Sequence, residues 1–333
     1  MPAADGLAIE TSGLTKRFGH QTVVDAIDLA VPEGSVFGFL GPNGSGKTTT
    51  IRMLLGLAYP NAGQVRVLGR EIPALAELSL PDVGALVEGP AFYPYLSGRD
   101  NLLRYDEVGP EYRRGVSLAS SLVGSSRRTA AADRRRRIDN ALDRVGLAAA
   151  ATKKYRAYSL GMRQRLAIAA AVTRPRRLLV LDEPTNGLDP QGTREVRALV
   201  RNVATEGSTV FLSSHLLNEV EQVCTHAAIM FAGRIVTQGP IEQLRAAQQR
   251  VLRVETLDVS QAASVLARIT GVGLTSPDPA AGVVRAELMS AQPEDCNAAM
   301  VGAGVRVRSL VTEQPSLEDL FVALTGEGFN VAQ

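Results

Sequence analysis

The stretch from Val36 to Leu57 constrains the fold of this chain more than any other. A strand-like run, Val36–Leu40, leads into the octet G-P-N-G-S-G-K-T, and a helical pattern follows over Thr49–Leu57. The glycines let the backbone curl so that successive N–H groups point inward at an anion, and the helix adds the positive end of its dipole. A strand, a loop and a helix in this order predict an α/β fold whose loop holds phosphate.

Each position of the octet has an expected role in such a site. The loop backbone would wrap the phosphates, Lys47 would bring a positive charge to the β and γ phosphates, and the Thr48 hydroxyl would bind Mg²⁺. The predicted ligand is therefore ATP or a similar nucleotide with its magnesium ion. The nucleotide-binding residues predicted in this segment are Gly41, Pro42, Asn43, Gly44, Ser45, Gly46, Lys47, Thr48 and Thr49.

A second apolar run, Leu178–Leu181, reads as a buried strand that ends in two carboxylates, Asp182 and Glu183. Taken alone, two acids at the end of a strand are as often structural as functional. After a phosphate loop, Asp182 is expected to complete the Mg²⁺ shell and Glu183 to activate the attacking water as a general base.

Three further motifs stand in a fixed order around this pair. They are S-x-G-x-x-Q-R at Ser159–Arg165, N-G-L-D-P at Asn186–Pro190 and S-S-H at Ser213–His215. Together with the octet and L-L-V-L-D-E-P, they resemble the ATPases of the ATP-binding cassette (ABC) family over residues 7–240. The whole chain resembles the ATPase subunits of the daunorubicin and bacitracin type of exporter.

The resemblance implies that two copies enclose two Mg-ATP molecules head to tail. In that arrangement the signature residues Ser159, Gly161 and Met162 contact the γ-phosphate held by the other subunit, and Asp189 lies in a loop that crosses the dimer interface. A serine hydroxyl and backbone N–H groups at a helix start form an anion site, which agrees with this role.

Two more roles follow from the resemblance. His215 matches the histidine that contacts the γ-phosphate and orients the attacking water, so Glu183 and His215 are the predicted catalytic pair. Phe18, in K-R-F-G, matches the aromatic residue that stacks on adenine.

The chain departs from the family pattern at two sites. The signature usually reads L-S-G-G-Q, whereas Tyr158, Leu160 and Met162 here replace the leucine, the first glycine and the glutamine. Where a glutamine usually touches Mg²⁺ and the membrane subunit, this chain has Glu88. A carboxylate still binds this hard cation but cannot donate a hydrogen bond, so the predicted Mg²⁺ ligands are Thr48, Glu88 and Asp182.

The pattern changes after Gly239–Pro240, which divides the chain into two expected domains. Residues 7–240 form an ABC ATP-binding domain with a mixed sheet and a helical subdomain over about 88–175. Residues 241–333 form a small α+β domain, for which the resemblance implies a regulatory or dimer-stabilising role. Its expected elements follow the split β-α-β-β-α-β order plus a last helix: Val251–Thr256, Ser260–Ile269, Gly271–Ser276, Val283–Leu288, Glu294–Val301, Val305–Val311 and Ser316–Thr325.

The segment Arg104–Arg137 is longer than the family connection and carries the run Arg134–Arg137. One interpretation is a solvated surface of the helical subdomain. The other is a contact with acidic lipid or with the cytoplasmic face of a partner. The residues leave both open.

Composition bears on the partners. No run of about 18 apolar residues occurs, so a separate transmembrane permease is expected, with Phe92, Tyr93 and Tyr95 near its docking groove. No secretory signal is visible and the chain has two cysteines, so a cytoplasmic location, peripheral on the inner face of the membrane through the permease, is expected. The expected cargo is a drug-like or peptide antibiotic, inferred from the resemblance alone.

Two alternatives from other classes remain. A soluble ABC ATPase acting on nucleic acid or ribosomes would commonly carry two fused cassettes, coiled-coil insertions or zinc sites. None of these occurs, and a net charge of +2 gives no steering field toward nucleic acid, so no nucleic-acid partner is expected. A P-loop kinase would leave Ser159–Arg165 and His215 unexplained.

Overall fold

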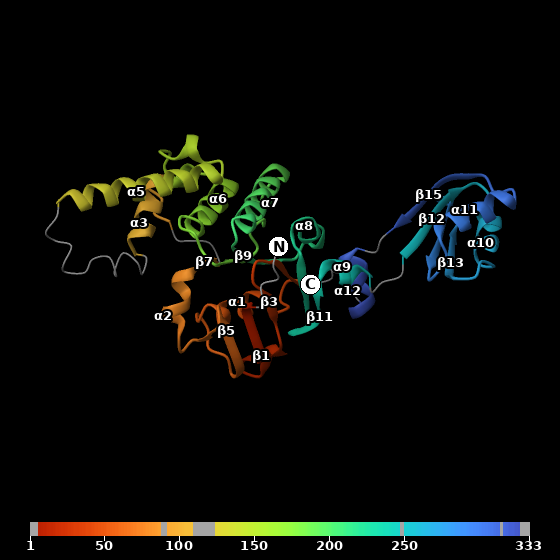
Figure 1. Ribbon diagram of the computed structural model, residues 1–333, viewed down its shortest axis with the longest axis horizontal. Helices are drawn as coiled ribbons and strands as arrows, with labels where there is room; N and C mark the ends of the chain where they lie inside the picture. Colours follow the sequence, from red (N-terminus) through yellow and green to blue (C-terminus); the bar gives the residue numbers. More distant parts are fainter. Residues whose placement is uncertain (1–5, 88–91, 109–123, 247–249, 314–315, 327–333) are drawn as a thin grey trace. The chain divides into compact units, whose positions relative to one another are not determined.

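The computed structural model describes residues 6–87, 92–108, 124–246, 250–313 and 316–326, with the side chains of 108 and 124–130 left aside. Its contacts divide the chain into two compact units. The boundary along the sequence falls between Pro240 and Ile241. Figure 1 follows the chain through both units. Glu88, one of the predicted Mg²⁺ ligands, lies outside the described residues.

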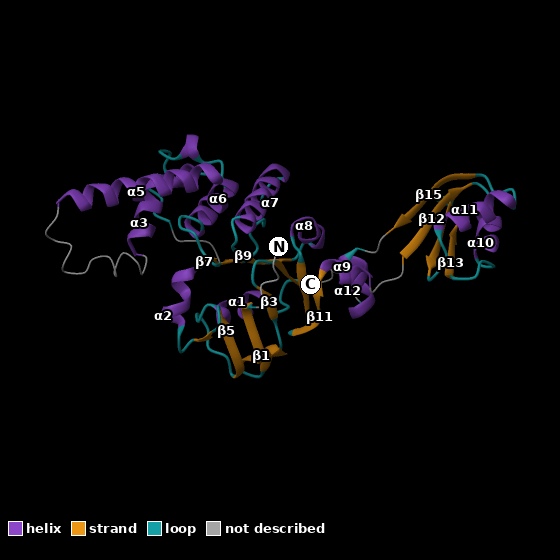
Figure 2. Cartoon of the chain, in the orientation of Figure 1, coloured by secondary structure: helices purple, strands orange, loops and turns teal. Residues whose placement is uncertain are grey.

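Unit 1 contains two sheets (Figures 1 and 2). The smaller one is antiparallel, in the order β2-β1-β5-β6, with β3 paired to β1. Its long strand β1 pairs with three neighbours, β2, β3 and β5, and so organises the sheet. The strands are β1 (Leu7–Phe18), β2 (Gln21–Ile27), β3 (Ala30–Pro32), β5 (Ala62–Val67) and β6 (Arg70–Ile72).

The larger sheet has the order β11-β10-β4-β9-β8-β7. All its pairings are parallel except the β10–β11 pair at one edge. Parallel strands end on the same side, so β4, β8 and β9 bring the residues that follow them to one edge. The strands are β4 (Val36–Leu40), β7 (Val83–Leu86), β8 (Leu178–Leu181), β9 (Thr209–Ser214), β10 (His226–Phe231) and β11 (Arg234–Pro240).

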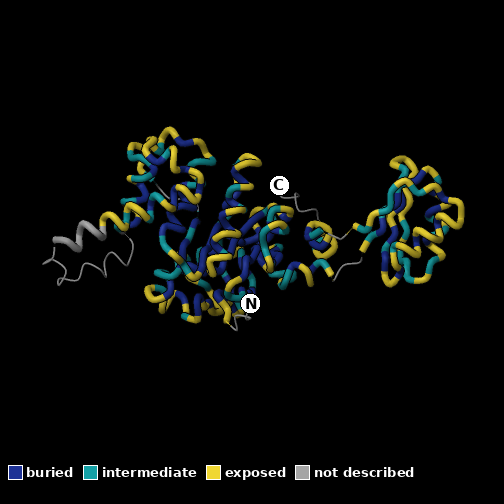
Figure 3. Tube along the Cα trace, turned by 45° about the horizontal axis from the view of Figure 1, so that its top comes forward, coloured by how far each residue is buried: buried dark blue, intermediate teal, exposed yellow. Residues whose placement is uncertain are grey.

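Helix α1 (Lys47–Leu54) contributes to the core shared by the two sheets. Its Ile51 and Leu54 are fully buried in one cluster with Phe37, Phe39 and residues of β1, β2 and β5. Each such side chain contributes roughly 1.5–3 kcal/mol by leaving water. This packing fixes the helix against the strand β4 that precedes it, and buried residues, dark blue in Figure 3, fill the interior of the unit.

Two helices contact the strands β4 and β9 of the larger sheet: α7 (Pro190–Thr205) and α8 (Leu217–Val223). The buried residues of α7 recur at helical spacing, at Val196, Leu199, Val200 and Val203. This spacing places them on one face of the helix.

A layer of helices, α3, α5 and α6, belongs to the segment of about residues 88–175 for which the sequence predicts a helical subdomain. Helices α3, α5 and α6 contact one another, and α6 also contacts β7. The bounds are α3 (Gly98–Val108), α5 (Gly124–Arg144), α6 (Leu160–Ala171) and the short elements α2 (Ala76–Ser79), η1 (Leu80–Asp82), η3 (Ala148–Ala150) and η4 (Tyr155–Ala157).

The arginine run on α5 is divided between solvent and the helical layer. The Asp106 carboxylate, only 3% exposed, receives Arg174 Nε at 2.8 Å, Arg137 Nη2 at 3.5 Å and Arg134 Nε at 3.7 Å. Arg135 and Arg136 are exposed. A buried carboxylate must be paired, so two residues of the run have a structural role inside the subdomain.

Unit 2 contains a four-stranded antiparallel sheet in the order β13-β14-β12-β15 (Figure 2). This order confirms the split β-α-β-β-α-β arrangement. Helices α10 and α11 pack on one face, and Leu252, Val284 and Cys296 belong to the core between them. The elements are β12 (Arg250–Thr256), α10 (Val259–Leu266), β13 (Val272–Asp278), β14 (Val283–Leu288), α11 (Pro293–Gly302) and β15 (Val307–Glu313).

Two helices of unit 2 flank this sheet in the sequence and contact each other. They are α9 (Ile241–Ala246) and α12 (Leu317–Thr325). Ser316 caps α12 with a reciprocal hydrogen-bond pair to Asp319, which explains the acids at the start of that helix. Over the part of the chain that the structure describes, no helix is both long enough and apolar enough to cross a bilayer.

Candidate nucleotide-binding site

The glycine-rich loop joins the end of β4 to the start of α1. Gly46, the residue before the helix, has φ 108°, and a Cβ there would lie 2.6 Å from Val23 O and 2.7 Å from Met230 Cε. Only glycine takes this conformation in this space. The tight passage lets the loop return directly into the helix, which begins at Lys47.

The Lys47 side chain is almost completely buried under the loop. Its Nζ donates to Gly41 O at 2.6 Å and Pro42 O at 3.1 Å, and lies 3.5 Å from Glu183 Oε1. Burial lowers the pKa of this ammonium below 10.5, while the Glu183 and Asp182 carboxylates oppose the shift. The buried Lys47 ammonium would therefore be stabilised in its charged form by any further negative charge at the site.

Asp182 lies at the end of β8 and accepts two hydroxyl hydrogen bonds. Thr48 Oγ1 donates to its Oδ2 at 2.9 Å, and Ser213 Oγ donates to its Oδ1 at 2.5 Å. The structure therefore brings together two of the predicted Mg²⁺ ligands, Thr48 and Asp182. Their hydroxyl and carboxylate oxygens are the ligands that Mg²⁺ prefers, so the donor set fits this ion.

Among the described residues, no group of three or more His, Cys, Asp and Glu side chains forms a metal site. Mg²⁺ in nucleotide sites keeps several waters and takes one or two protein oxygens plus phosphate oxygens, without an all-protein cage.

Glu183 contacts both Lys47 of the glycine-rich loop and His215, the residue that follows β9. Its Oε2 lies 2.8 Å from His215 Nδ1, and its backbone N–H donates to Ser213 Oγ at 2.9 Å. The backbone of Glu183 is left-handed, with φ 47°. A non-glycine residue held there stores about 1–3 kcal/mol, and such strain is concentrated at functional sites.

The other loop residues line the outside of this arrangement. Asn43 and Gly44 are exposed, and Pro42 and Thr49 are half-buried. The Ser45 hydroxyl is buried and has no hydrogen-bond partner within the described residues.

The signature motif forms the start of α6. Ser159 caps this helix by accepting the Met162 N–H at 3.3 Å, and both Ser159 and Leu160 are exposed. A Cβ at Gly161 would lie 3.4 Å from Leu188 Cδ2. The signature therefore borders the Gly187–Asp189 turn of the same chain.

Asp189 has a local structural role in addition to its predicted one. It caps α7, because its Oδ1 accepts the Gly192 N–H at 2.8 Å. Across the described residues, no hydrogen bond or ion pair joins the signature or Asp189 to the glycine-rich loop. The structure thus assembles Lys47, Thr48, Asp182, Glu183 and His215, whereas Ser159, Leu160 and Asp189 are exposed and make no bond to this group in the described residues.

Phe18 ends β1 with an exposed ring (54%). Lys16 Nζ lies 5.1 Å from the ring centroid and donates to Tyr59 O at 2.6 Å. The ring is thus available for stacking, and one cation is held against it.

Two residues without a predicted role bond to the segment Asp182–Thr185, the catalytic segment. Ser213 contacts both Asp182 and Glu183, and Gln164 Nε2 of α6 donates to Pro184 O at 3.2 Å. Both lie inside motifs that the sequence displays, S-S-H and S-x-G-x-x-Q-R. Their targets follow only from the way β8, β9 and α6 pack.

Several known proteins are similar to this chain. The family model described as ABC transporter matches residues 24–186. The bacitracin transport ATP-binding protein BcrA of Bacillus licheniformis is 36% identical over 321 residues, which cover 96% of this chain and 98% of that protein. The daunorubicin/doxorubicin resistance ATP-binding protein DrrA of Streptomyces peucetius is 34% identical over 330 residues, covering 96% and 92%.

A solved structure supports the fold of unit 1. The ADP conformation of an ATP-binding cassette of an ABC transporter aligns with a TM-score of 0.60 at 22% identity. The alignment covers 72% of this chain and 92% of that one.

Proposed function

Because this chain belongs to the family of ATP-binding subunits of ABC transporters, we propose that the site on Gly41–Thr48 powers a separate membrane permease that exports a drug-like or peptide antibiotic. The chain binds and hydrolyses ATP as members of this family do. The names of the bacitracin and daunorubicin relatives support the antibiotic class of the cargo. One observation carries the proposed chemistry: the Glu183 carboxylate lies between the buried Lys47 and His215.

Lys47 binds the phosphate chain. Its ammonium already lies among oxygens, those of Gly41, Pro42 and Glu183. Phosphate oxygens stabilise the charged form that burial disfavours, so ATP and the lysine favour one another. The loop N–H groups and the start of α1 add further positive potential.

Thr48 and Asp182 hold Mg²⁺, together with Glu88 as the third proposed ligand. Asp182 and Glu183 are two carboxylates beside a polyanionic substrate, and like charges at this range repel. Mg²⁺ held by these residues would offset that repulsion and would neutralise charge that develops on the phosphates. Ser213 keeps the Asp182 carboxylate oriented.

Glu183 acts as the general base. One carboxylate oxygen faces Lys47 and the other faces His215. The carboxylate accepts a proton from the attacking water, and His215 holds the water and the γ-phosphate in line.

The second half of each site comes from another copy of the chain. Ser159 and Leu160 are exposed at the start of α6, and that helix start presents N–H groups suited to an anion. We assign Ser159, Gly161 and Met162 to the γ-phosphate bound by the other copy, and Asp189 to the interface. Phe18 stacks on adenine within its own copy.

The permease docks on the exposed aromatic residues Tyr93 and Tyr95 (51% and 63% exposed), whose ring centroids lie 5.8 Å apart. Phe92 anchors this segment by an edge contact of 5.3 Å with Tyr155. Rings with an apolar body and a polar tip suit such an interface. Docking places the chain on the inner face of the cell membrane, and unit 2 serves regulation or dimer stability.

Capture of the closed complex tests this function. A tagged Glu183→Gln variant is expressed in its own host, membranes are solubilised with Mg-ATP, and co-purifying chains are identified by mass spectrometry. We expect a multi-span membrane protein in comparable amount, absent when Lys47→Ala is also introduced. Recovery of ribosomal or DNA-associated proteins without a membrane protein would replace the transporter proposal by the soluble ATPase alternative.

A further inference from the structure

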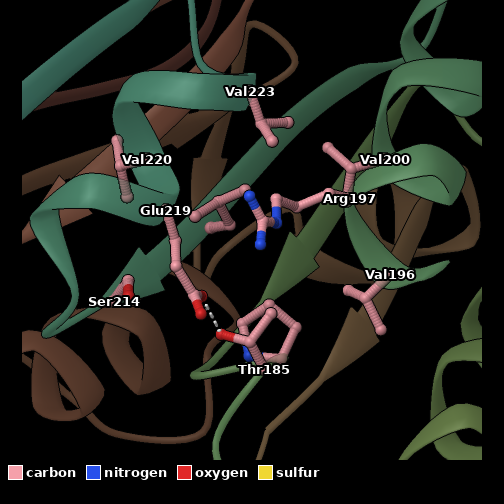
Figure 4. A pocket seen from close by; sticks show the side chains of 10 residues that line it. Thr185, Val196, Arg197, Val200, Ser214, Glu219, Val220 and Val223 are labelled. Carbon is pink, nitrogen blue, oxygen red and sulfur yellow. Dashed lines mark hydrogen bonds between the residues drawn. The ribbon is translucent and has the colours of Figure 1, made fainter. Parts of the chain in front are cut away.

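A narrow cavity of about 20 Å³ lies behind the catalytic segment, between α7 and α8 (Figure 4). Such a volume has room for about one water molecule. Its walls are mainly apolar, with Val196 and Val200 from α7 and Val220 from α8. Figure 4 shows Thr185 and Glu219 pointing toward each other, with the side chain of Arg197 from α7 projecting into the same space.

The Thr185 hydroxyl donates to Glu219 Oε2 at 2.5 Å. Thr185 is buried and Glu219 is half-buried. A short O–H···O⁻ hydrogen bond in a water-poor setting is stronger than one at the surface. Glu219 also lies in the first turn of α8, where a negative charge is favoured.

The two residues belong to the segments that carry the catalytic pair. Thr185 follows Glu183 by two positions, and Glu219 follows His215 by four. The Glu183–His215 contact joins these same segments, as does Ser213 through its bond to the Glu183 N–H. The Thr185–Glu219 bond is therefore a further link between these two segments.

Glu183 needs such support because its backbone is strained. A left-handed glutamate relaxes unless its neighbours hold it. Gln164 holds the Pro184 carbonyl from the α6 side, at 3.2 Å. Thr185 and Glu219 hold the chain from the α8 side, so the two residues that follow the strained Glu183 are each bonded to a neighbouring helix.

We propose that Glu219 is a positioning residue for ATP hydrolysis. It acts through the Thr185 hydroxyl to keep the side chains of Glu183 and His215 in their relative positions. The inference rests on the proposed catalytic roles of those two residues. Glu219 does not touch the glycine-rich loop in any described contact. Its loss should therefore slow the chemical step and leave ATP binding intact.

The test uses the full chain and compares kcat, KM and the Kd for ATP. In Glu219→Ala we expect kcat to fall about tenfold, because small misplacements of reacting groups have large effects on rate. The Kd should stay within about twofold of the parent. Thr185→Val should reproduce this, whereas Glu219→Gln and Thr185→Ser keep an acceptor or a donor and should retain most of kcat.

The double variant Glu219→Ala with Thr185→Val adds a readout that general destabilisation does not mimic. If the two residues act as one unit, the double variant is no slower than either single variant. The matched control is Asn218→Ala, an exposed position on the same helix, with unchanged kcat.

Unchanged kcat in a folded Glu219→Ala protein would overturn the inference. Multiplying losses in the double variant, or a Kd that weakens in step with kcat, would overturn it as well. Glu183→Gln separates this inference from the proposed function. If that variant still hydrolyses ATP at the parent rate, the catalytic assignment itself falls; if it is inactive while Glu219→Ala is normal, only the role of Glu219 falls.

Discussion

At the scale of single residues, charge and backbone strain meet in Glu183. The carboxylate lies near a buried lysine on one side and a histidine on the other, and its backbone is left-handed. Neither neighbour is close in sequence, so the environment of this side chain is produced by β4, β8 and β9 together. A group placed in this way is suited to accept a proton from water.

Glu183→Gln should separate binding from hydrolysis. The amide has nearly the same shape but does not accept the proton, so hydrolysis is expected to fall by about 10²–10⁴-fold. ATP binding should persist, because Lys47 and the loop are unchanged. Phosphate release and equilibrium ATP binding measure the two quantities. Glu206→Gln, at an exposed ion pair with Arg144, is the control, and hydrolysis above a tenth of the parent rate contradicts the assignment.

Two glycines of the loop provide a matched comparison. Both have positive φ, but a Cβ at Gly44 meets nothing within 4 Å, whereas one at Gly46 would lie 2.6 Å from Val23 O. Gly44→Ala should show only the backbone cost, about 1 kcal/mol. Gly46→Ala must also displace the backbone, so its ATP affinity should be much lower, by isothermal titration. Equal losses in the two variants would show that this close approach does not shape the loop.

At the scale of elements, an ion pair between Arg306 and Asp258, called here the clip, links two segments of unit 2 outside its apolar core. Arg306, just before β15, donates to both carboxylate oxygens of Asp258, just before α10, at 2.6 Å and 2.9 Å, and adds its backbone N–H. These hydrogen bonds lower the pKa of Asp258 from 3.8 to about 2. The clip links the turn after β12, the first strand of unit 2 in the sequence, to the start of its neighbour β15, the last strand.

The clip gives unit 2 a defined acid sensitivity. Because the folded-state pKa is depressed, the stabilisation is complete above about pH 4 and is lost as the pH falls toward 2. Asp258→Asn should remove this dependence and speed hydrogen exchange of β15 amides at neutral pH. Asp278→Asn, on the exposed end of β13, is the control. Exchange of β15 identical to the parent would show that the clip adds no stability.

At the scale of the whole molecule, the proposed site has two parts, the glycine-rich loop and the signature at the start of α6, and in the described residues these parts are not bonded to each other within one copy. A second copy completes the site if its signature meets the first copy's γ-phosphate. Association of two copies should then require ATP, and it should require that the start of α6 carries no negative charge.

Gly161→Asp tests this dependence. With Mg-ATP, the Glu183→Gln protein should run as a dimer in size-exclusion chromatography with light scattering. Adding Gly161→Asp should return it to a monomer that still binds ATP, because an acid would face phosphate. A Cβ at Gly161 is tolerated at 3.4 Å from Leu188, and Gly302→Asp, at an open position of α11, is the control. A dimer that survives Gly161→Asp would place the interface elsewhere.

The sequence by itself determined the fold class, and it predicted the order of elements and the phosphate-binding role of the loop. These features depend on local rules, because glycine spacing, strand alternation and helix caps act between near neighbours. The elements of unit 2 agree with the expected ones within a few residues, and their sheet order follows from that succession. The five motifs were visible for the same reason.

The tertiary structure alone decided which side chains act on each other. The Asp106 carboxylate takes two arginines from the run on α5, and Thr185 meets Glu219 across a cavity. Parallel strands β8 and β9 bring Ser213 to Asp182, although the two are far apart in the chain. Such pairings depend on sheet register and helix packing, which a single sequence does not encode locally.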